Sequence, residues 1–348
     1  MHLDFLPTDY IVWLLFLGCL LAAVWIYRQP HYRILWKSVF QNKVAVTAFC
    51  ILVIYVVIGL LDSIHYDVLV QNIVQQKTVL DLLIHPIGTF DETTYTKPFE
   101  VSHHYHFLGT NKIGQDVFYE AIKSIRTALL IGTLTTLFML PFALFFGTLA
   151  GYFGGIVDDV IQYIYTTLSS IPGVLLITAM VLVMQVYISN HPLLFPTIAD
   201  RADIRLLTLC FILGISGWAG LCRLLRAETL KLREQDFVTA SIAMGARKLP
   251  IIFRHILPNV MHIILITVVL DFSGLVLAEA ILAYVGVGVD PTTPSFGNMI
   301  NTSRLELARE PTVWWPLFAA LLFMFVLVLA ANLFADAVRD AFDPKVGH

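Results

Sequence analysis

Apolar residues are concentrated in seven runs, each long enough to cross a bilayer, which takes about 20 helical residues with a range of about 17 to 25. Polar and charged residues collect in the segments between these runs. Long apolar runs joined by polar connections predict an all-α polytopic membrane protein. The seven runs are Tyr10–Tyr27, Val44–Leu61, Thr127–Ala150, Asp159–Tyr187, Arg205–Cys222, Val260–Gly286 and Val313–Ala335.

The composition supports this membrane assignment. Of the 348 residues, 58% are hydrophobic and 14% are charged, whereas soluble domains carry about 25% charged residues. The formal net charge of −3 indicates no nucleic-acid partner. The cysteines all lie in apolar segments without the spacing of a metal or redox site, so we expect small buried side chains and no metal site. They are Cys19, Cys50, Cys210 and Cys222.

Basic residues predict the orientation of the spans. Residues 28–43 carry four Lys or Arg and no acid, and a loop of this kind stays on the cytoplasmic side of the membrane. The segment before the first run holds Asp4 and Asp9 and no Lys or Arg. Counting spans from there, we expect the N-terminus outside and the C-terminal tail in the cytoplasm.

Local patterns add three further expectations. Pro172 lies within the fourth run and predicts a kink there. Gly147, Gly151 and Gly155 are spaced four apart, which favours close approach of two helices or a tight turn. Before the second run, apolar residues recur at helical spacing and predict a short helix on the inner membrane surface. Its apolar residues are Tyr32, Leu35, Trp36, Val39 and Phe40.

The longest polar interruption in the C-terminal half covers residues 226–259 and lies between two apolar runs. Its many Lys and Arg residues predict a cytoplasmic position. Asp236 is suited to cap a short helix over Phe237–Met244, and Gly245 can end that helix in a left-handed turn.

A second helix is expected in the same interruption. Pro250 suits its first turn, and Pro258 marks where it ends or kinks. A short exposed helix on a cytoplasmic loop between two spans predicts a docking site for a soluble partner.

This stretch resembles the ATPase-coupling loop of ABC importer permeases, which has the form EAA-x3-G-x9-I-x-LP. It resembles more closely the second permease subunit of the dipeptide/oligopeptide/nickel branch, where FVxAAxxxGA…FRHILPN is usual. Thr239, Ser241 and His255 depart from the pattern. The resemblance implies a set of residues that couple the chain to an ATPase: Asp236, Phe237, Ala240, Ser241, Gly245 and Ala246.

The resemblance extends over most of the chain, from about residue 32 to residue 345. Residues 106–132 resemble PLGTDxxGRDVxSRxxxGxRxSLxxG, with Asn111 for Asp and Gln115 for Arg, which puts a fixed ion pair there in doubt. Asp158 matches in GYFGGxVD. Other matching stretches are LAEAILAYVGVGV, DPTTPSFGNMI and the closing ANLFADAVRDAFDPK.

The fold implied is a type I ABC importer transmembrane domain, with six family spans and one added N-terminal span. The chain then divides into an extra transmembrane helix (1–30), an elbow helix with the first family span (31–62), an extracytoplasmic loop (63–122), the permease domain (123–337, with the coupling loop at 223–259) and a cytoplasmic tail (338–348).

The function implied is that of a permease subunit in the bacterial inner membrane, which moves di- or oligopeptides. Its implied partners are a homologous second permease, two cytoplasmic ABC ATPases, an extracytoplasmic binding protein and membrane lipid. The chain has no G-x-x-x-x-G-K-[ST] phosphate loop, so it is not expected to be an enzyme or to hold a cofactor, and the ATPases would bind ATP and Mg²⁺. Alternatives are uptake of nickel complexes, other metal complexes or antimicrobial peptides, an ATP-independent secondary transporter, and a non-transporting scaffold.

Two carboxylates lie at membrane depth in the sixth run. Asp271 and Glu279 are costly there and are expected to face a cavity, a partner or water. Both are candidates for the translocation path, where Asp271 could attract a peptide's amino terminus. For Asp271, the equally weighted alternative is a hydrogen bond between helices or a pair with the second permease.

The predicted extracytoplasmic loop contains several histidines, and two basic residues follow it. A histidine group could bind a metal, but no carboxylate or cysteine is spaced to complete a site, so a solvated loop is favoured. Lys123 and Arg126 lie near the outer end of a span, where they are expected to snorkel to water. The histidines are His65, His85, His103, His104 and His106.

Overall fold

The computed structural model describes residues 2–3, 6–28, 30–70, 73–84, 94–99 and 106–342. In this part of the chain, seven helices are long and apolar enough to cross a membrane, which agrees with the all-helical prediction. They are α1 (Pro7–Arg28), α3 (Lys43–Asp62), α5 (Val117–Phe153), α7 (Gly173–Asn190), α8 (Ile198–Arg233), α11 (Leu257–Val285) and α13 (Trp315–Phe342). The shorter helices are α2 (Pro30–Gln41), α4 (Val79–Ile84), α6 (Gly155–Ser170), α9 (Asp236–Ala243), α10 (Lys248–Ile251) and α12 (Phe296–Glu306).

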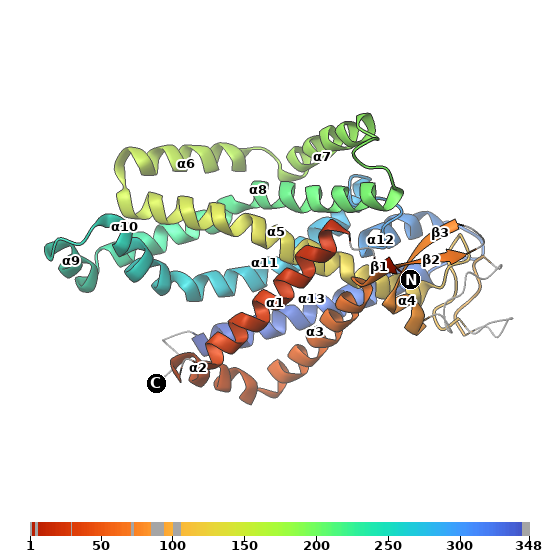
Figure 1. The fold of residues 1–348 in the computed structure, drawn as a ribbon, viewed down its shortest axis with the longest axis horizontal. Coiled ribbons are helices and arrows are strands. Elements are labelled where there is room, and N and C mark those ends of the chain that lie inside the picture. Colours follow the sequence, from red (N-terminus) through yellow and green to blue (C-terminus); the bar gives the residue numbers. More distant parts are fainter. Residues whose placement is uncertain are drawn as a thin grey trace.

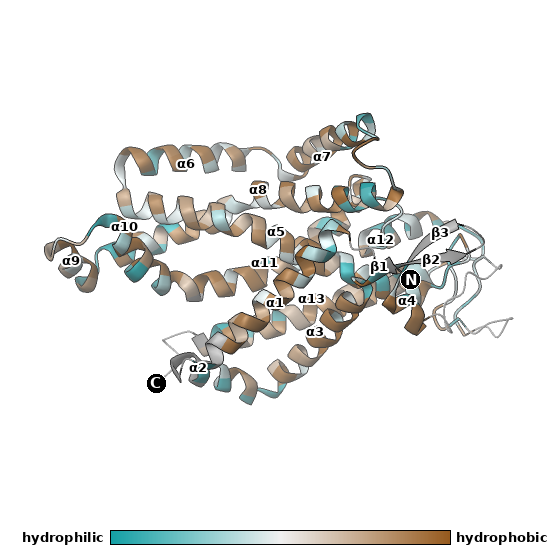
Figure 2. Ribbon diagram, in the orientation of Figure 1, coloured by the Kyte–Doolittle hydropathy of each residue, from teal (hydrophilic) through white to brown (hydrophobic). Residues whose placement is uncertain are grey.

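The long helices extend along the longest dimension of the molecule (Figure 1). α2, α9 and the last turns of α13 lie at one end, which we call the α9 end. A small sheet and the N-terminus lie at the other, which we call the sheet end (Figure 1). Hydrophobic residues cover the long helices, and hydrophilic residues gather toward both ends (Figure 2). This is the distribution expected of helices whose middle sections face lipid or one another.

The sheet is antiparallel and was not predicted. It has the order β1 (His2–Leu3), β2 (His65–Val70) and β3 (Ile73–Thr78), with His2 opposite Asp67 and Tyr66 opposite Lys77. A two-residue strand is too short to show a period-2 pattern. The sheet joins the segment before α1 to the loop that follows α3.

The fourth apolar run is two helices, because the kink predicted at Pro172 is a complete break. α6 ends at Ser170, and Pro172 is the N-cap of α7. Proline has no backbone N–H to donate to the preceding turn, and its ring clashes with the helix before it. Of the two pieces, α7 meets the length and hydropathy of a membrane span.

α5 and α8 are much longer than their apolar runs. They have 37 and 36 residues, and a helix of that length measures about 55 Å, which exceeds the hydrocarbon thickness of about 30 Å. Both helices therefore extend beyond the membrane core at their polar ends. Their positions bring α5 and α8 side by side over most of their length.

Glycines allow the close approach of α5 and α8. A Cβ on Gly151 would lie 2.6 Å from the Cβ of Thr229, and one on Gly147 would lie 2.8 Å from the Cβ of Leu225. The predicted close contact is therefore confirmed at Gly147 and Gly151. Gly155 has no atom within 4 Å of its Cβ position and a φ of +55°, so it serves the turn between α5 and α6.

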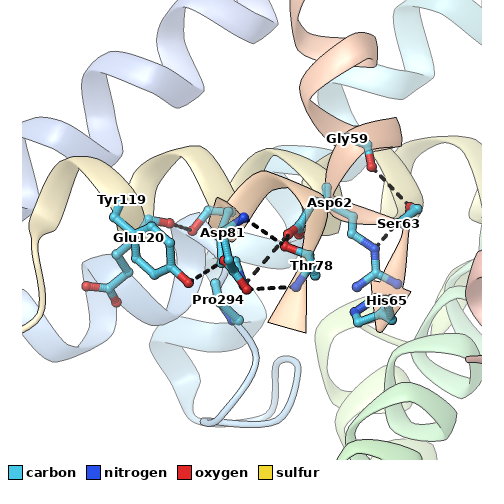
Figure 3. Close-up of polar contacts among 12 residues, drawn as sticks. Gly59, Asp62, Ser63, His65, Thr78, Asp81, Tyr119, Glu120 and Pro294 are labelled. Carbon is cyan, nitrogen blue, oxygen red and sulfur yellow. Dashed lines mark hydrogen bonds and ion pairs between the residues drawn. The ribbon is translucent and has the colours of Figure 1, made fainter. Parts of the chain in front are cut away.

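Two basic residues of α5 lie at the sheet end. Lys123 Nζ is 2.8 Å from Asp81 Oδ1 and 3.7 Å from Asp62 Oδ1, and Figure 3 shows both carboxylates facing the same space. Arg126 Nη2 is 2.6 Å from Asp9 Oδ1 of α1. The two basic side chains are 16% and 13% exposed. The expectation that they snorkel to water is wrong, because acids within the chain neutralise them.

The predicted surface helix before the second run is α2. Val39 is 1% exposed and packs with Ala45 of α3 and with Ala337 and Val338 of α13. Phe40 is exposed and lies against Phe49, with ring centroids 5.3 Å apart. This places α2 across the ends of α3 and α13 at the α9 end. The side chains of Tyr32 and Leu35 lie outside the described residues, as do Asp343 and Pro344 of the tail.

Candidate functional site

α9 is an eight-residue helix between the end of α8 and the start of α10. Its N-cap is Gln235, whose side chain makes no capping hydrogen bond, so the capping role predicted for Asp236 is wrong. Asp236 lies instead in the first turn, where a negative charge is favourable to the helix dipole. The Thr239 hydroxyl donates to the Asp236 carbonyl (3.0 Å). The helix therefore begins and ends one residue earlier than predicted.

Gly245 ends α9 as predicted. Its φ is +82°, a left-handed conformation that glycine adopts without steric cost. The Gly245 amide donates to the Ile242 carbonyl (2.9 Å) and the Ala246 amide donates to the Ser241 carbonyl (3.1 Å). These two bonds form a Schellman motif. They fix the direction in which the chain leaves the helix.

The second helix starts as predicted, with Pro250 in the first turn of α10. It does not end at Pro258. A π-helical turn over Ile252–Ile256 joins α10 to α11, and Pro258 lies in the first turn of α11. Such wider turns are rare and often occur at functional sites. The chain is thus helical without interruption from the coupling loop into a membrane span.

One face of α9 is anchored by a small apolar cluster, which we call the footing. Val238 is fully buried and is its member on α9. The others are Tyr152 of α5, Ile251 of α10, and Ile252 and Ile256 of the π-turn, with Leu232 of α8 packed against them. α9 is therefore held to the ends of three long helical segments at once. The sequence showed Val238 only as part of a motif and did not indicate this role.

The other face of α9 is open. Phe237, Ile242 and Met244 are 41%, 50% and 81% exposed, and large apolar side chains at this exposure favour a protein contact. Ser241 is 7% exposed, and its hydroxyl donates to the Phe237 carbonyl (2.7 Å), so it belongs to the buried side. The other predicted coupling residues are all exposed: Asp236, Phe237, Ala240, Gly245 and Ala246.

Polar contacts join the segments around the footing. The Arg226 Nη2 donates to Asp158 Oδ2 (2.6 Å), which ties α8 to α6. The Arg233 guanidinium donates to the Tyr152 carbonyl (3.4 Å). Sequence reasoning matched Asp158 to a family motif but did not identify its partner, because the two residues are 68 positions apart.

The two candidate translocation-path carboxylates differ in their surroundings. Glu279 is 3% exposed and lies beside Ser295 and Gly297 at the start of α12, and its Oε1 has no hydrogen-bond partner among the residues that the structure describes. Asp271 is half-buried on the same helix, with no hydrogen bond or ion pair to any residue that the structure describes. The pathway role of both residues stays a prediction.

Two members of the predicted histidine group, His65 and His106, pair with acids. His65 Nδ1 lies 2.8 Å from Asp9 Oδ2, and His106 Nδ1 lies 2.9 Å from Asp116 Oδ2. In the described ranges no three His, Cys, Asp or Glu side chains gather as metal ligands. His85, His103 and His104 lie outside those ranges.

The motif at residues 106–132 builds the N-terminal end of α5. Asp116 Oδ1 accepts from the amides of Phe118 (2.7 Å) and Tyr119 (3.1 Å), which is an N-cap. Asn111 donates to Glu120 Oε2 (2.9 Å). At residue 111, where the family pattern has Asp, a neutral Asn side chain therefore donates to the Glu120 carboxylate.

Comparison with known proteins places this architecture in a family. The family model described as binding-protein-dependent transport system inner membrane component matches residues 143–348, which include α9 and every residue of the footing. The chain is 32% identical over 239 residues to the oligopeptide transport system permease protein OppC of Mycobacterium tuberculosis (strain ATCC 25618 / H37Rv), covering 69% of this chain and 76% of that protein.

Two relatives from Bacillus subtilis (strain 168) are also similar. The chain is 29% identical over 241 residues to its oligopeptide transport system permease protein OppC, covering 69% of this chain and 72% of the relative. It is 28% identical over 245 residues to its dipeptide transport system permease protein DppC, covering 69% of each. The chain therefore belongs to the binding-protein-dependent transport system inner membrane components, as a non-catalytic, cofactor-free, multi-pass permease subunit of an ABC transporter that works with a separate ATPase and a binding protein.

Proposed function

We propose that this permease carries di- or oligopeptides across the inner membrane, as one of two homologous permease subunits bound to two cytoplasmic ATPases. The printed names of its relatives, which are oligopeptide and dipeptide permeases, support this substrate class. The α9 end faces the cytoplasm and the sheet end faces outward, where the binding protein delivers substrate. The basic segment at residues 28–43 and the odd number of spans support this orientation.

The observation that carries the proposal is the footing under α9. An exposed helix that binds an ATPase transmits movement only if its own attachment is stiff. Val238 buries its whole side chain against Tyr152, Ile252 and neighbouring residues, and close-packed interiors transmit displacement because they compress little. A push on Phe237 and Met244 is therefore passed to α5, α8 and α11 together.

ATP supplies the two states that allosteric coupling requires. When the ATPases close, they move α9 toward the axis of the complex, and the attached spans tilt. The permease cavity then opens to the other side of the membrane. Asp271 lies on α11, one of the spans that move, and an unpaired acid there is suited to bind the amino group of a peptide during passage.

The test uses the complete transporter in proteoliposomes. The binding protein is placed on the side of the membrane that the sheet end faces. Uptake of a labelled peptide and ATP hydrolysis are measured for the wild type, for Ala240→Arg and for the matched small-residue control Ala240→Ser. We expect Ala240→Arg to abolish uptake while the subunit still inserts and assembles, and Ala240→Ser to retain uptake. Normal uptake by Ala240→Arg would overturn the coupling role of α9.

The same assay separates the substrate classes. Peptides are expected to stimulate ATP hydrolysis in the presence of the binding protein, whereas nickel ions or nickel complexes are not. Stimulation by nickel and not by peptide would replace peptide as the substrate. Uptake driven by an ion gradient without ATP would instead show a secondary transporter.

A further inference from the structure

α1 is separated from its neighbours by a cavity. The cavity has a volume of about 600 Å³, which lies within the range of about 300–1,000 Å³ seen for small-molecule sites. α1, α3 and α5 form its walls, with an almost entirely apolar surface. Residues from each wall include Val12, Leu15 and Phe16 of α1, Leu52 and Val56 of α3, and Leu129 of α5.

The sheet end of the cavity is closed by a polar lock. Arg126 and Ser63 line the cavity there, and the Arg126 guanidinium bonds Ser63 Oγ (3.2 Å) and Asp9 Oδ1 (2.6 Å). The Thr8 amide of α1 donates to Asp203 of α8 (3.0 Å). The charge of Arg126 is thus balanced within the chain. This end offers no free positive charge to a ligand.

The α9 end of the cavity is different, because the helices that form its walls carry basic residues beyond that end. Arg28 ends α1, Lys37 lies in α2 and Lys43 begins α3. All three side chains are exposed, and residues 28–43 contain no acid. Phe49 lines the cavity, six residues after Lys43, which is about 9 Å along the helix. Arg28 lies eight residues after the lining residue Leu20 of α1, which is about 12 Å along that helix.

The chemistry of the two parts fits one kind of occupant. Water needs two to four polar partners to fill a cavity, and the walls offer almost none. A hydrocarbon chain from the bilayer meets only apolar side chains there. Lys and Arg clusters beside a membrane span attract anionic headgroups. We propose that this cavity binds an anionic phospholipid, with its headgroup on Arg28, Lys37 and Lys43 and an acyl chain between α1 and α3.

This site would give α1 two different attachments. The polar lock holds its sheet end, and the lipid fills the space along its middle and inner part. Val12 and Leu15 already contact the core formed by α5 and α8 near the lock. A bound lipid completes the packing of a helix of which little is buried within the chain. The lipid is thus a structural component between α1 and the family spans.

The experiment measures which lipids remain bound to the complete transporter. The complex is reconstituted in nanodiscs of equal parts phosphatidylglycerol and phosphatidylcholine, released into detergent and examined by native mass spectrometry. We expect retained phosphatidylglycerol on the wild type. Val56→Trp fills the cavity and is expected to lose it. Ile54→Trp, on the same helix but outside the cavity, keeps it and controls for the added bulk.

The headgroup is tested by charge. The double variant Arg28→Gln and Lys43→Gln is expected to lose the preference for phosphatidylglycerol over phosphatidylcholine. Lys231→Gln, which removes an exposed basic residue elsewhere at the same end, retains that preference. The proposal is overturned if the wild type retains no lipid, if Val56→Trp retains as much as the wild type, or if phosphatidylcholine is retained equally well.

Discussion

The two ends of the molecule bury their ion pairs to different extents. At the sheet end, Arg126 and Lys123 are at most 16% exposed and pair with Asp9 and Asp81. At the α9 end, Arg226 pairs with Asp158 while 24% exposed and Lys231 pairs with Glu228 while 72% exposed. A buried pair is costly to break, whereas an exposed pair contributes little. The buried pairs therefore fix the positions of the helices at the sheet end, and α9 is held at the other end by the apolar footing.

The largest effect is expected at the sheet end. Arg126→Met removes the cation beside the buried Asp9 carboxylate, and breaking a buried pair from one side costs about 3–5 kcal/mol. We expect a large drop in the melting temperature of the detergent-solubilised complex, followed by fluorescence-detected size exclusion. The same change at an exposed position, Lys231→Met, should leave the melting temperature nearly unchanged.

A second variant sharpens this result. Arg126→Met combined with Asp9→Leu replaces the pair with apolar side chains, which is often neutral or stabilising in a buried site. It should recover most of the lost stability. If the double variant is as unstable as Arg126→Met, the loss has another cause than the unpaired carboxylate.

The footing is the next most sensitive feature. Val238→Ala removes two buried methyl groups and leaves a small cavity, at a cost of about 2 kcal/mol. The expected result is weakened coupling: ATP hydrolysis continues while peptide uptake per ATP falls. Val238→Ile, which keeps the volume filled, should retain more uptake than Val238→Ala. Equal transport by both variants would show that the footing is not the transmitting contact.

A smaller effect is expected at the pair between α8 and α6. Arg226→Lys keeps the charge opposite Asp158 but loses one of the two hydrogen bonds of the guanidinium, at a cost of about 1 kcal/mol. We expect a modest decrease in melting temperature. Arg226→Met should give a clearly larger decrease, and the opposite order would contradict the ion-pair explanation.

The smallest effect at neutral pH concerns titration at the sheet end. Burial opposes ionisation of the Asp81 carboxyl, but the Lys123 ammonium and hydrogen bonds from Thr78 and Tyr119 hold its pKa below the usual value. A carboxyl with a lowered folded pKa contributes stability above its unfolded pKa of about 3.9, and this is lost as the pH falls through the folded pKa.

The measurement compares melting temperature with pH for the wild type and Asp81→Asn. The difference between them should stay constant from neutral pH down to about pH 5 and shrink below about pH 4. A difference that already disappears between neutral pH and about pH 6 would mean that a group other than Asp81 controls the stability of the sheet end.

Features that depend on neighbouring residues were predicted well. The length and hydropathy of the apolar runs indicate spans directly, and Gly245 ends α9 because only a residue that tolerates positive φ fits there. The start of α9 was missed by one residue. Side-chain preference pointed to Asp236, but the fold places the first turn by the burial of Val238.

Features that depend on distant residues were not predicted. Arg126 and Asp9 are 117 positions apart, and nothing near either one shows that they meet. Basic side chains at a span end suggest contact with water unless the partner is known. The footing has the same limitation, since Tyr152 and Val238 lie on different elements and meet only when α5 and α9 are folded together.

The helix break between α6 and α7 lies on an exposed flank of the chain. Ile171, Val174 and Leu175 are 43%, 43% and 64% exposed, so the break is uncovered in the single chain. Hydrocarbon tails cannot accept the amide protons at the start of α7 or donate to the last carbonyl groups of α6. The exposed helix ends at this break therefore favour contact with water or with another protein surface over contact with lipid tails.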